Sequence, residues 1–367
     1  MIIFLALVVS FVITYVSIPS IIKVADEKHL YDLPNEIKIS HKTGIPTLGG
    51  IAVFGGTVIT TTFFVELSSI PKIGYILSAM TLLFFTGVKD DVIPLTPRKK
   101  FVAQVLAAAI LTLKADIRLT SLYGLFDIHT LPYWISITIS LFTIIVIINA
   151  FNLIDGINGL AGGIGIIVSL TFGYFFFQIQ ETGWVVFTLA LSGSILAFLR
   201  FNFANKIFMG DTGSLLVGCI SATLAITFIE NPKIQAQYSN SFIPVFAFSI
   251  LIIPLFDTLR VFTIRIAKKK SPFQGDRNHT HHILVDEGLA HWQASLIMYA
   301  ANILIILLAT SLQHLSALLV LMVVLALSFV LTLIPLYLRK IKANNKTPVT
   351  ARASTNQTVE KQEVQQN

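Results

Sequence analysis

Long apolar runs follow one another along almost the whole chain, and they restrict its fold more than any other feature. Eleven such runs are recognisable, and most are 17 to 24 residues long, the length that an α-helix needs to cross a bilayer. Only 12% of the 367 residues are charged, about half the share usual in soluble domains, which is roughly 25%. The runs predict helices at 2–24, 47–66, 72–89, 101–114, 133–151, 159–178, 183–199, 212–229, 242–264, 293–311 and 315–338.

These runs predict an all-α, polytopic transmembrane bundle of about eleven helices. A membrane β-barrel would instead show short stretches in which apolar and polar residues alternate. We expect residues 1–338 to form one integral membrane domain and residues 339–367 to form a polar, disordered tail. No internal repeat is visible, which argues against transporter folds built from inverted repeats.

The basic residues define the orientation of the bundle. With eleven helices, 22 of the 26 Lys and Arg residues fall on the side of the loops that follow odd-numbered helices. The positive-inside rule makes that side cytoplasmic, so the N-terminus is expected outside and the C-terminus in the cytoplasm. The net charge of +7 therefore reflects membrane orientation, and nucleic acid is not expected as a partner.

The stretch from Asn149 to Gly163 joins two apolar runs and carries polar groups at the mouth of the membrane. On a continuous helix, Asn152, Gly156 and Gly159 would share a face, with Asp155 at its flank. Such a face combines oxygen ligands with a strip where a substrate can lie against backbone. The alternative is close helix packing, for which small residues suffice.

Two acidic motifs flank this stretch on the same predicted side. Asp90 and Asp91 end the third run, and mutual repulsion of adjacent carboxylates favours a proton on one of them, which makes the pair a candidate base. Lys99 and Lys100 follow and can hold a phosphate, or they can be ordinary positive-inside lysines. Asp211 lies between two glycines and can either cap the eighth helix or bind Mg²⁺ together with Asn152.

Two further segments carry candidate phosphate ligands. Residues 277–282 read Arg-Asn-His-Thr-His-His, and without cysteines nearby they suit pyrophosphate oxygens better than zinc. The glycine-rich stretch 42–50 begins with Lys42 and enters the second helix, where free N–H groups can bind an anion. No Walker loop, GxGxxG motif or catalytic triad is present in the sequence. A phosphoryl transfer in which a lipid phosphate attacks a nucleotide diphosphate fits this set of groups.

Together these motifs resemble the polyprenyl-phosphate N-acetylhexosamine-1-phosphate transferases over about residues 30–290. The resemblance implies a Mg²⁺-dependent enzyme, with Mn²⁺ as a substitute, that transfers a sugar 1-phosphate from a UDP-sugar to undecaprenyl phosphate and releases UMP. It implies a bacterial cytoplasmic membrane with the site facing the cytosol, and it leaves a homodimer open.

The resemblance also implies a role for each matching residue. It assigns the metal to Asn152 and Asp211, the lipid phosphate to Lys99 and Lys100, and catalysis to Asp90, Asp91 and Asp155. The residues implied to bind the nucleotide sugar are Lys42, Asn158, Arg277, His279, His281 and His282.

Within the family, the sequence is more similar to the branch that uses UDP-GlcNAc for surface glycans such as O-antigen or teichoic acid. The branch that uses UDP-MurNAc-pentapeptide has a Pro-Ile-His-His-His-Phe-Glu-like loop and Asp where this chain has Asn158. Two other classes stay open from sequence alone, a carrier for anionic metabolites and a structural membrane scaffold.

Overall fold

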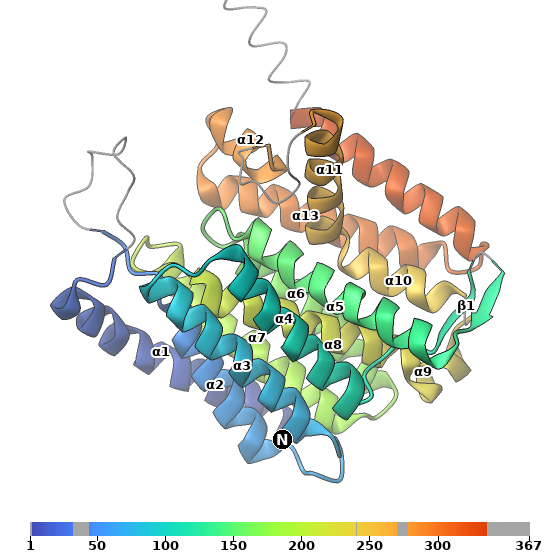
Figure 1. Cartoon of the computed structure of the whole chain (residues 1–367), viewed down its shortest axis with the longest axis horizontal. Coiled ribbons are helices and arrows are strands. Elements are labelled where there is room, and N and C mark those ends of the chain that lie inside the picture. The colour runs from blue at the N-terminus through green and yellow to red at the C-terminus, as the bar shows by residue number, and fades with distance from the viewer. Residues whose placement is uncertain (1, 32–43, 126, 240, 270–277, 336–367) are drawn as a thin grey trace, which may run out of the picture.

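The computed structural model describes residues 2–31, 44–125, 127–239, 241–269 and 278–335. Its long helices lie side by side in one bundle (Figure 1). The labelled helices are α1 (Ile2–Lys28), α2 (Gly49–Phe64), α3 (Ile73–Val92), α4 (Pro97–Ala109, continued by a π-helical turn Ile110–Lys114), α5 (Tyr133–Ile154), α6 (Leu160–Gln178), α7 (Thr182–Asn202), α8 (Gly210–Glu230), α9 (Pro232–Gln237), α10 (Phe242–Ile250), α11 (Ile252–Ala267), α12 (Thr280–Asp286) and α13 (His291–Ser311). A further apolar helix covers Ala317–Pro335.

The polytopic helical fold predicted from the sequence is confirmed. Within the described residues, eight helices are long and apolar enough to cross a membrane, and the bent pair α10–α11 makes a ninth. The other two predicted spans coincide with the shorter helices α2 and α4. Large apolar side chains such as Phe63, Phe142 and Leu307 point outward from the bundle, as a bilayer requires.

Two local features differ from the prediction. The outer loop 115–132 contains an antiparallel hairpin of β1 (Ser121–Leu125) and β2 (Ile128–Thr130) in a chain predicted to be all-α. The predicted span 242–264 is not straight, because α10 and α11 meet at 81°. Pro254 explains the bend, since it has no N–H to donate to the carbonyl of Ile250 four residues earlier.

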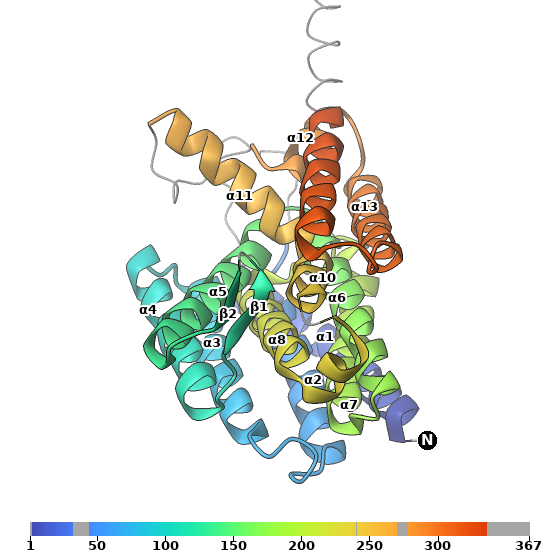
Figure 2. The same cartoon turned by 90° about the vertical axis from the view of Figure 1, so that its right-hand side faces the viewer.

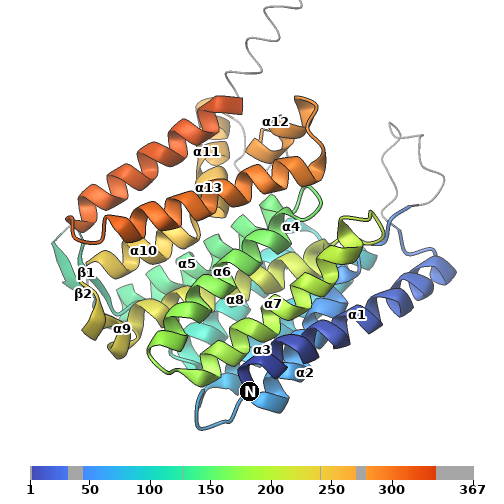
Figure 3. The same ribbon diagram turned by 180° about the vertical axis from the view of Figure 1, so that it is seen from behind.

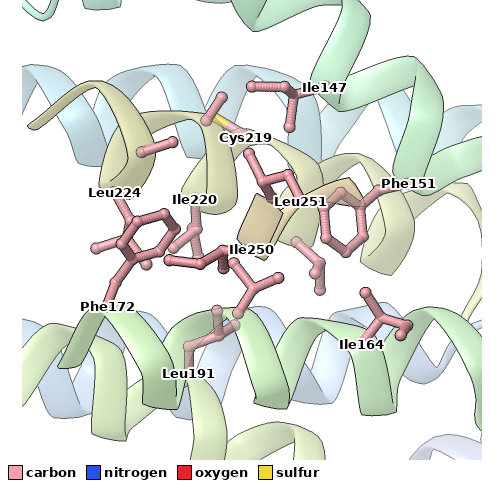
Figure 4. Packing of buried hydrophobic residues seen from close by; sticks show 14 of the residues in the cluster. Ile147, Phe151, Ile164, Phe172, Leu191, Cys219, Ile220, Leu224, Ile250 and Leu251 are labelled. Atoms are coloured by element: carbon pink, nitrogen blue, oxygen red, sulfur yellow. The ribbon is translucent and has the colours of Figure 1, made fainter. Parts of the chain in front are cut away.

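Helix α8 occupies the centre of the bundle, and its most apolar stretch is 94% buried. Figure 2 shows the other helices arranged around it. Figure 3 shows α6, α7 and α13 on the side opposite to the view of Figure 1. Residues from several of these helices belong to one apolar core, including Cys219 of α8, Ile147 of α5, Ile164 of α6 and Ile250 of α10 (Figure 4). This core fixes α8, so the first turn of α8 is a rigid place for a site.

Two glycines bring neighbouring helices against that first turn. A Cβ atom on Gly50 of α2 would collide with the backbone of Gly213, and one on Gly87 of α3 would collide with the backbone of Thr212. The backbone of α2 also donates to the two residues just before α8, since Gly49 N bonds the carbonyl of Phe208 and Gly50 N bonds that of Met209, each at 2.9 Å. The N-terminus of α8 is therefore held by α2 and α3 together.

Candidate functional site

The ends of four helices meet at one end of the bundle around the ammonium group of Lys100. Lys100 lies in the first turn of α4, and its Nζ forms an ion pair with Asp211 and another with Asp90 at 3.4 Å. It also donates to Asn152 Oδ1 at 3.3 Å. The structure thus brings together four residues from α3, α4, α5 and α8 that the sequence analysis had grouped in three separate motifs.

Asp211 and Asn152 are in direct contact in this cluster. Asn152 Nδ2 donates to Asp211 Oδ1 at 2.5 Å and to Ser214 Oγ at 2.9 Å. Ser214 had received no role in the sequence analysis. The sequence alternative that Asp211 caps α8 with its side chain is wrong, because Met209 is the N-cap residue and the Asp211 carboxylate faces Lys100 and Asn152.

Asp91 provides the cap of α8 from another helix. Its carboxylate accepts hydrogen bonds from Asp211 N at 2.7 Å, from Thr212 N at 3.0 Å and from Thr212 Oγ1 at 2.5 Å. Unpaired N–H groups and the positive end of the helix dipole both attract a carboxylate there. The two adjacent acids therefore differ, because Asp90 faces Lys100 whereas Asp91 holds the backbone of Asp211.

The stretch 155–159 is a loop between α5 and α6. The predicted continuous helical face is wrong, because α5 ends at Ile154 and Gly159 takes a left-handed conformation with φ of 84° before α6 begins. Burial, together with the nearby negative charges of Asp211 and Asp91, raises the pKa of Asp155 to about 8. Asp155 therefore lies close to the Lys100 cluster and is predominantly protonated at neutral pH.

Asn158 is buried within this loop. Its Nδ2 donates to Asn205 Oδ1 at 2.5 Å, and Gly159 N donates to Asn202 Oδ1 at 2.7 Å. The end of α7 and the loop after it therefore hold the loop 155–159. Asn202 and Asn205 had received no role from the sequence, although the spacing of carboxamides after an apolar run was a usable signal.

The loop glycines act in close packing, as the sequence alternative proposed. A Cβ atom on Gly156 would collide with the rings of His281 and His282, and one on Gly159 would collide with the ring of Phe203. One on Gly163, in the first turn of α6, would collide with Tyr299 of α13. The Tyr299 hydroxyl also donates to the carbonyl of Gly159. Without these glycines, neither α12 nor α13 could lie so close to the loop.

The histidine segment 279–282 lies against this loop and is held by Asp257 of α11. His279 Nδ1 lies 2.8 Å from Asp257 Oδ2, and Asp257 also forms an ion pair with Arg260 at 3.1 Å. Burial lowers the pKa of His281 to about 3, so this imidazole is neutral. Neither of its ring nitrogens has a hydrogen-bond partner among the residues that the structure describes.

Not every candidate residue belongs to this arrangement. Lys99 is exposed, whereas Lys100 on the next position points into the cluster. Lys42 and Arg277 lie outside the described residues. The N–H groups of Gly49 and Gly50 do not offer the predicted anion site, because they already donate to Phe208 and Met209.

The sequence analysis gave no role to Gln104, which lies one turn after Lys100. Its Nε2 donates to Asn149 Oδ1 at 3.2 Å, and Asn149 Nδ2 donates back to its Oε1 at 2.7 Å. This reciprocal pair joins α4 to α5 one turn below the contact between Lys100 and Asn152. The carboxamide of Asn149 was visible in the sequence, but its partner was not.

The cluster fits a hard divalent cation. Oxygens of Asp90, Asn152 and Asp211 converge on one ammonium group, so the protein already places a positive charge among three oxygen donors. Carboxylate and carboxamide oxygens are the ligands that Mg²⁺ prefers, and it accepts few of them alongside water and phosphate. Within the described residues there is no group of three or more His, Cys, Asp or Glu side chains that could hold a metal, so a cation here would depend also on the Asn152 carboxamide and on oxygens of water or phosphate.

Comparison with known proteins identifies relatives that match this chain over more than three quarters of the length of each protein. The model of glycosyl transferase family 4 matches residues 73–229. The chain is 31% identical over 293 residues to the undecaprenyl-phosphate alpha-N-acetylglucosaminyl 1-phosphate transferase of Yersinia pestis, covering 77% of each chain. It is 32% identical to the Salmonella typhi protein of that name, over 77% of this chain and 76% of that one. A probable undecaprenyl-phosphate N-acetylglucosaminyl 1-phosphate transferase of Bacillus subtilis is 28% identical, over 80% of each.

Proposed function

We propose, because this chain belongs to glycosyl transferase family 4, that it transfers a sugar 1-phosphate from a UDP-sugar to undecaprenyl phosphate. The sugar is N-acetylglucosamine, as in the names of the relatives. The observation that carries the proposal is the convergence of Asp90, Lys100, Asn152 and Asp211 at one end of the bundle. This convergence supplies groups for a lipid phosphate and for a diphosphate at the same place.

The reaction needs no nucleophile from the protein. An oxygen of the lipid phosphate attacks the sugar-bound phosphorus of the UDP-sugar, a new diphosphate bond forms, and the bond to UMP breaks. Asp211 and Asn152 would hold Mg²⁺, which would neutralise charge on the diphosphate when bound. Lys100 carries the positive charge that attracts the lipid phosphate, and Asp90 beside it positions that phosphate or accepts its proton.

The remaining groups recognise the donor. The histidine segment 279–282 and the loop 155–159 lie against each other, so a nucleotide sugar held by both would place its diphosphate beside Asp211. Asn158 would contact the uracil from this loop. Asp155 borders the same place and, being protonated at neutral pH in the free protein, adds no charge that would repel a phosphate.

The uneven distribution of Lys and Arg between the two sides of the membrane supports an orientation for the protein. The bilayer would surround the bundle, with the Lys100 cluster on the side where 22 of the 26 basic residues were predicted. We therefore place the protein in the bacterial cytoplasmic membrane with its site facing the cytosol, where UDP-sugars are made. The product would be the first lipid-linked intermediate of a cell-surface glycan.

Purified protein in detergent tests the proposal directly. UMP should be released from UDP-GlcNAc only when undecaprenyl phosphate and Mg²⁺ are both present, and EDTA or Asp211→Ala should abolish the release. Preference for UDP-MurNAc-pentapeptide would instead identify the peptidoglycan branch. Accumulation of labelled UDP-GlcNAc inside proteoliposomes without product would identify a carrier and refute the transferase.

A further inference from the structure

The bend between α10 and α11 is a built feature of the fold. Pro254 leaves the carbonyl of Ile250 without its helical partner, and Asn302 Nδ2 of α13 donates to that carbonyl at 3.2 Å. Asn302 is fully buried, and its bond gives the Ile250 carbonyl a partner that would be costly to lack inside the protein. Figure 2 shows the consequence, with α11 directed away from the bundle axis.

The bend places Asp257, which lies three residues after Pro254, beside the segment that follows α11. The Asp257 side chain is only 2% exposed, and its oxygens make four hydrogen bonds to residues of this region. The partners are His279 Nδ1 at 2.8 Å, Thr280 N at 3.0 Å, Thr280 Oγ1 at 2.6 Å and an Arg260 guanidinium nitrogen at 3.1 Å.

These bonds fix the start of α12 against the loop of the active site. Thr280 is the first residue of α12, and the next residue, His281, is completely buried against Gly156. Arg260 adds a second connection, because it also donates to the carbonyl of Asn278 at 2.5 Å. Among the described residues, the hydrogen-bond partners of Asp257 are this segment and Arg260, and Lys100, Asn152 and Asp211 are not among them.

We propose that Asp257 is a positioning residue that holds the histidine segment 279–282 over the loop 155–159, and so sets affinity for the phosphates of the nucleotide sugar. This inference rests on the proposed function, although Asp257 itself touches no substrate in it. Because its Nδ1 faces Asp257, His279 keeps a fixed ring orientation, and the other nitrogen is the one that can meet an anion. Loss of the carboxylate would let the segment move away from the loop.

The test uses the full-length protein in nanodiscs and the variant Asp257→Asn. The amide oxygen of Asn can still accept from Thr280 and Arg260. The amide nitrogen that would face His279 can only donate, so a protonated Nδ1 loses its acceptor and the charge-assisted contact is lost. Thr280→Val removes only the hydroxyl bond of 2.6 Å and serves as a second, milder variant. Thr263→Val is the matched control, because Thr263 is exposed on the same helix and bonds only the carbonyl of Leu259.

The variant Asp257→Asn should change the KM for one substrate and leave the KM for the other nearly unchanged. In Asp257→Asn, the KM for UDP-GlcNAc should rise about tenfold, the size expected for loss of one charge-assisted hydrogen bond. The KM for undecaprenyl phosphate should stay within about twofold, since Lys100 and Asp90 are untouched. Thr280→Val should show a smaller rise in the same constant, and Thr263→Val should show none.

Hydrogen–deuterium exchange gives a readout that does not depend on turnover. Peptides covering 279–290 should exchange faster in Asp257→Asn, whereas peptides from α8 should exchange as in the wild type. Unchanged exchange in 279–290, or equal rises in both KM values, would overturn the inference. A wild-type protein without UMP release would instead refute the proposed function, and that result is known before any variant is compared.

Discussion

Replacement of Asp91 separates a positioning carboxylate from a catalytic one. In Asp91→Ala, two backbone N–H groups in the first turn of α8 and the hydroxyl of Thr212 lose their acceptor. In Asp91→Asn, one carbonyl oxygen remains to accept, but the negative charge at the helix N-terminus is lost. Asp90→Asn is the comparison, because Asp90 faces Lys100 instead of the helix.

The loss in stability can be sized from these contacts. Removal of a capping side chain typically costs about 0.5–2 kcal/mol, and the charge at a helix N-terminus adds about 0.3–1 kcal/mol. Asp91→Ala should therefore destabilise the protein by about 1–3 kcal/mol, and Asp91→Asn by about half of that. At about 2 °C per kcal/mol for a chain of this size, the unfolding temperature should fall by about 2–6 °C in Asp91→Ala.

Thermal unfolding and UMP release measured on the same samples decide between the two roles. Asp91→Asn should keep activity within about tenfold of the wild type, whereas Asp90→Asn should lose about a hundredfold or more, as expected for a general base. The reasoning is refuted if Asp91→Asn unfolds at the wild-type temperature and yet loses activity as severely as Asp90→Asn.

Three further predictions concern pH and packing. Burial and nearby carboxylates raise the pKa of Asp155 to about 8. The folded state therefore binds the Asp155 proton more tightly than the unfolded state does, so the wild type loses stability as pH rises from about 4 to about 8. In EDTA, the difference between the unfolding temperatures of Asp155→Asn and the wild type should therefore shift in favour of the variant as pH rises over that interval. Burial lowers the pKa of His281 to about 3, so the wild type loses stability as pH falls below about 6.5, and His281→Leu should remove that loss. Gln104→Leu and Asn149→Leu should be non-additive, with the double variant less destabilised than the sum of the single ones, as a double-mutant cycle would measure.

The sequence predicted those parts of the fold that depend on neighbouring residues. The apolar runs gave the helical spans, because length and hydropathy are local properties of a membrane helix. The bend at Pro254 was missed because the apolar run continues through it. A proline in such a run only shows that a helical bond is lost. The partner that takes up the freed carbonyl of Ile250 is Asn302, which lies 52 residues after Ile250.

The sequence predicted which residues gather at the candidate site, but it did not predict which contact each of them makes. Asp90, Asn152 and Asp211 were grouped because polar residues near a membrane are expensive and tend to be functional. Which of two adjacent acids faces Lys100 depends on how α3 packs on α8, since Asp91 meets a backbone 120 residues away. The assumed helix through Gly156 failed for a related reason, because the loop conformation depends on contacts with α7, α12 and α13.

Binding of Mn²⁺ as a substitute for Mg²⁺ tests most directly whether the four converging residues form a metal and phosphate site. Titration of the full-length protein in detergent, followed by electron paramagnetic resonance of free Mn²⁺, reports binding without any need for turnover. The account predicts one site per chain that Mg²⁺ competes for, and that is lost in Asp211→Ala but kept in the control Thr263→Val. Equal Mn²⁺ binding by the wild type and Asp211→Ala would contradict it.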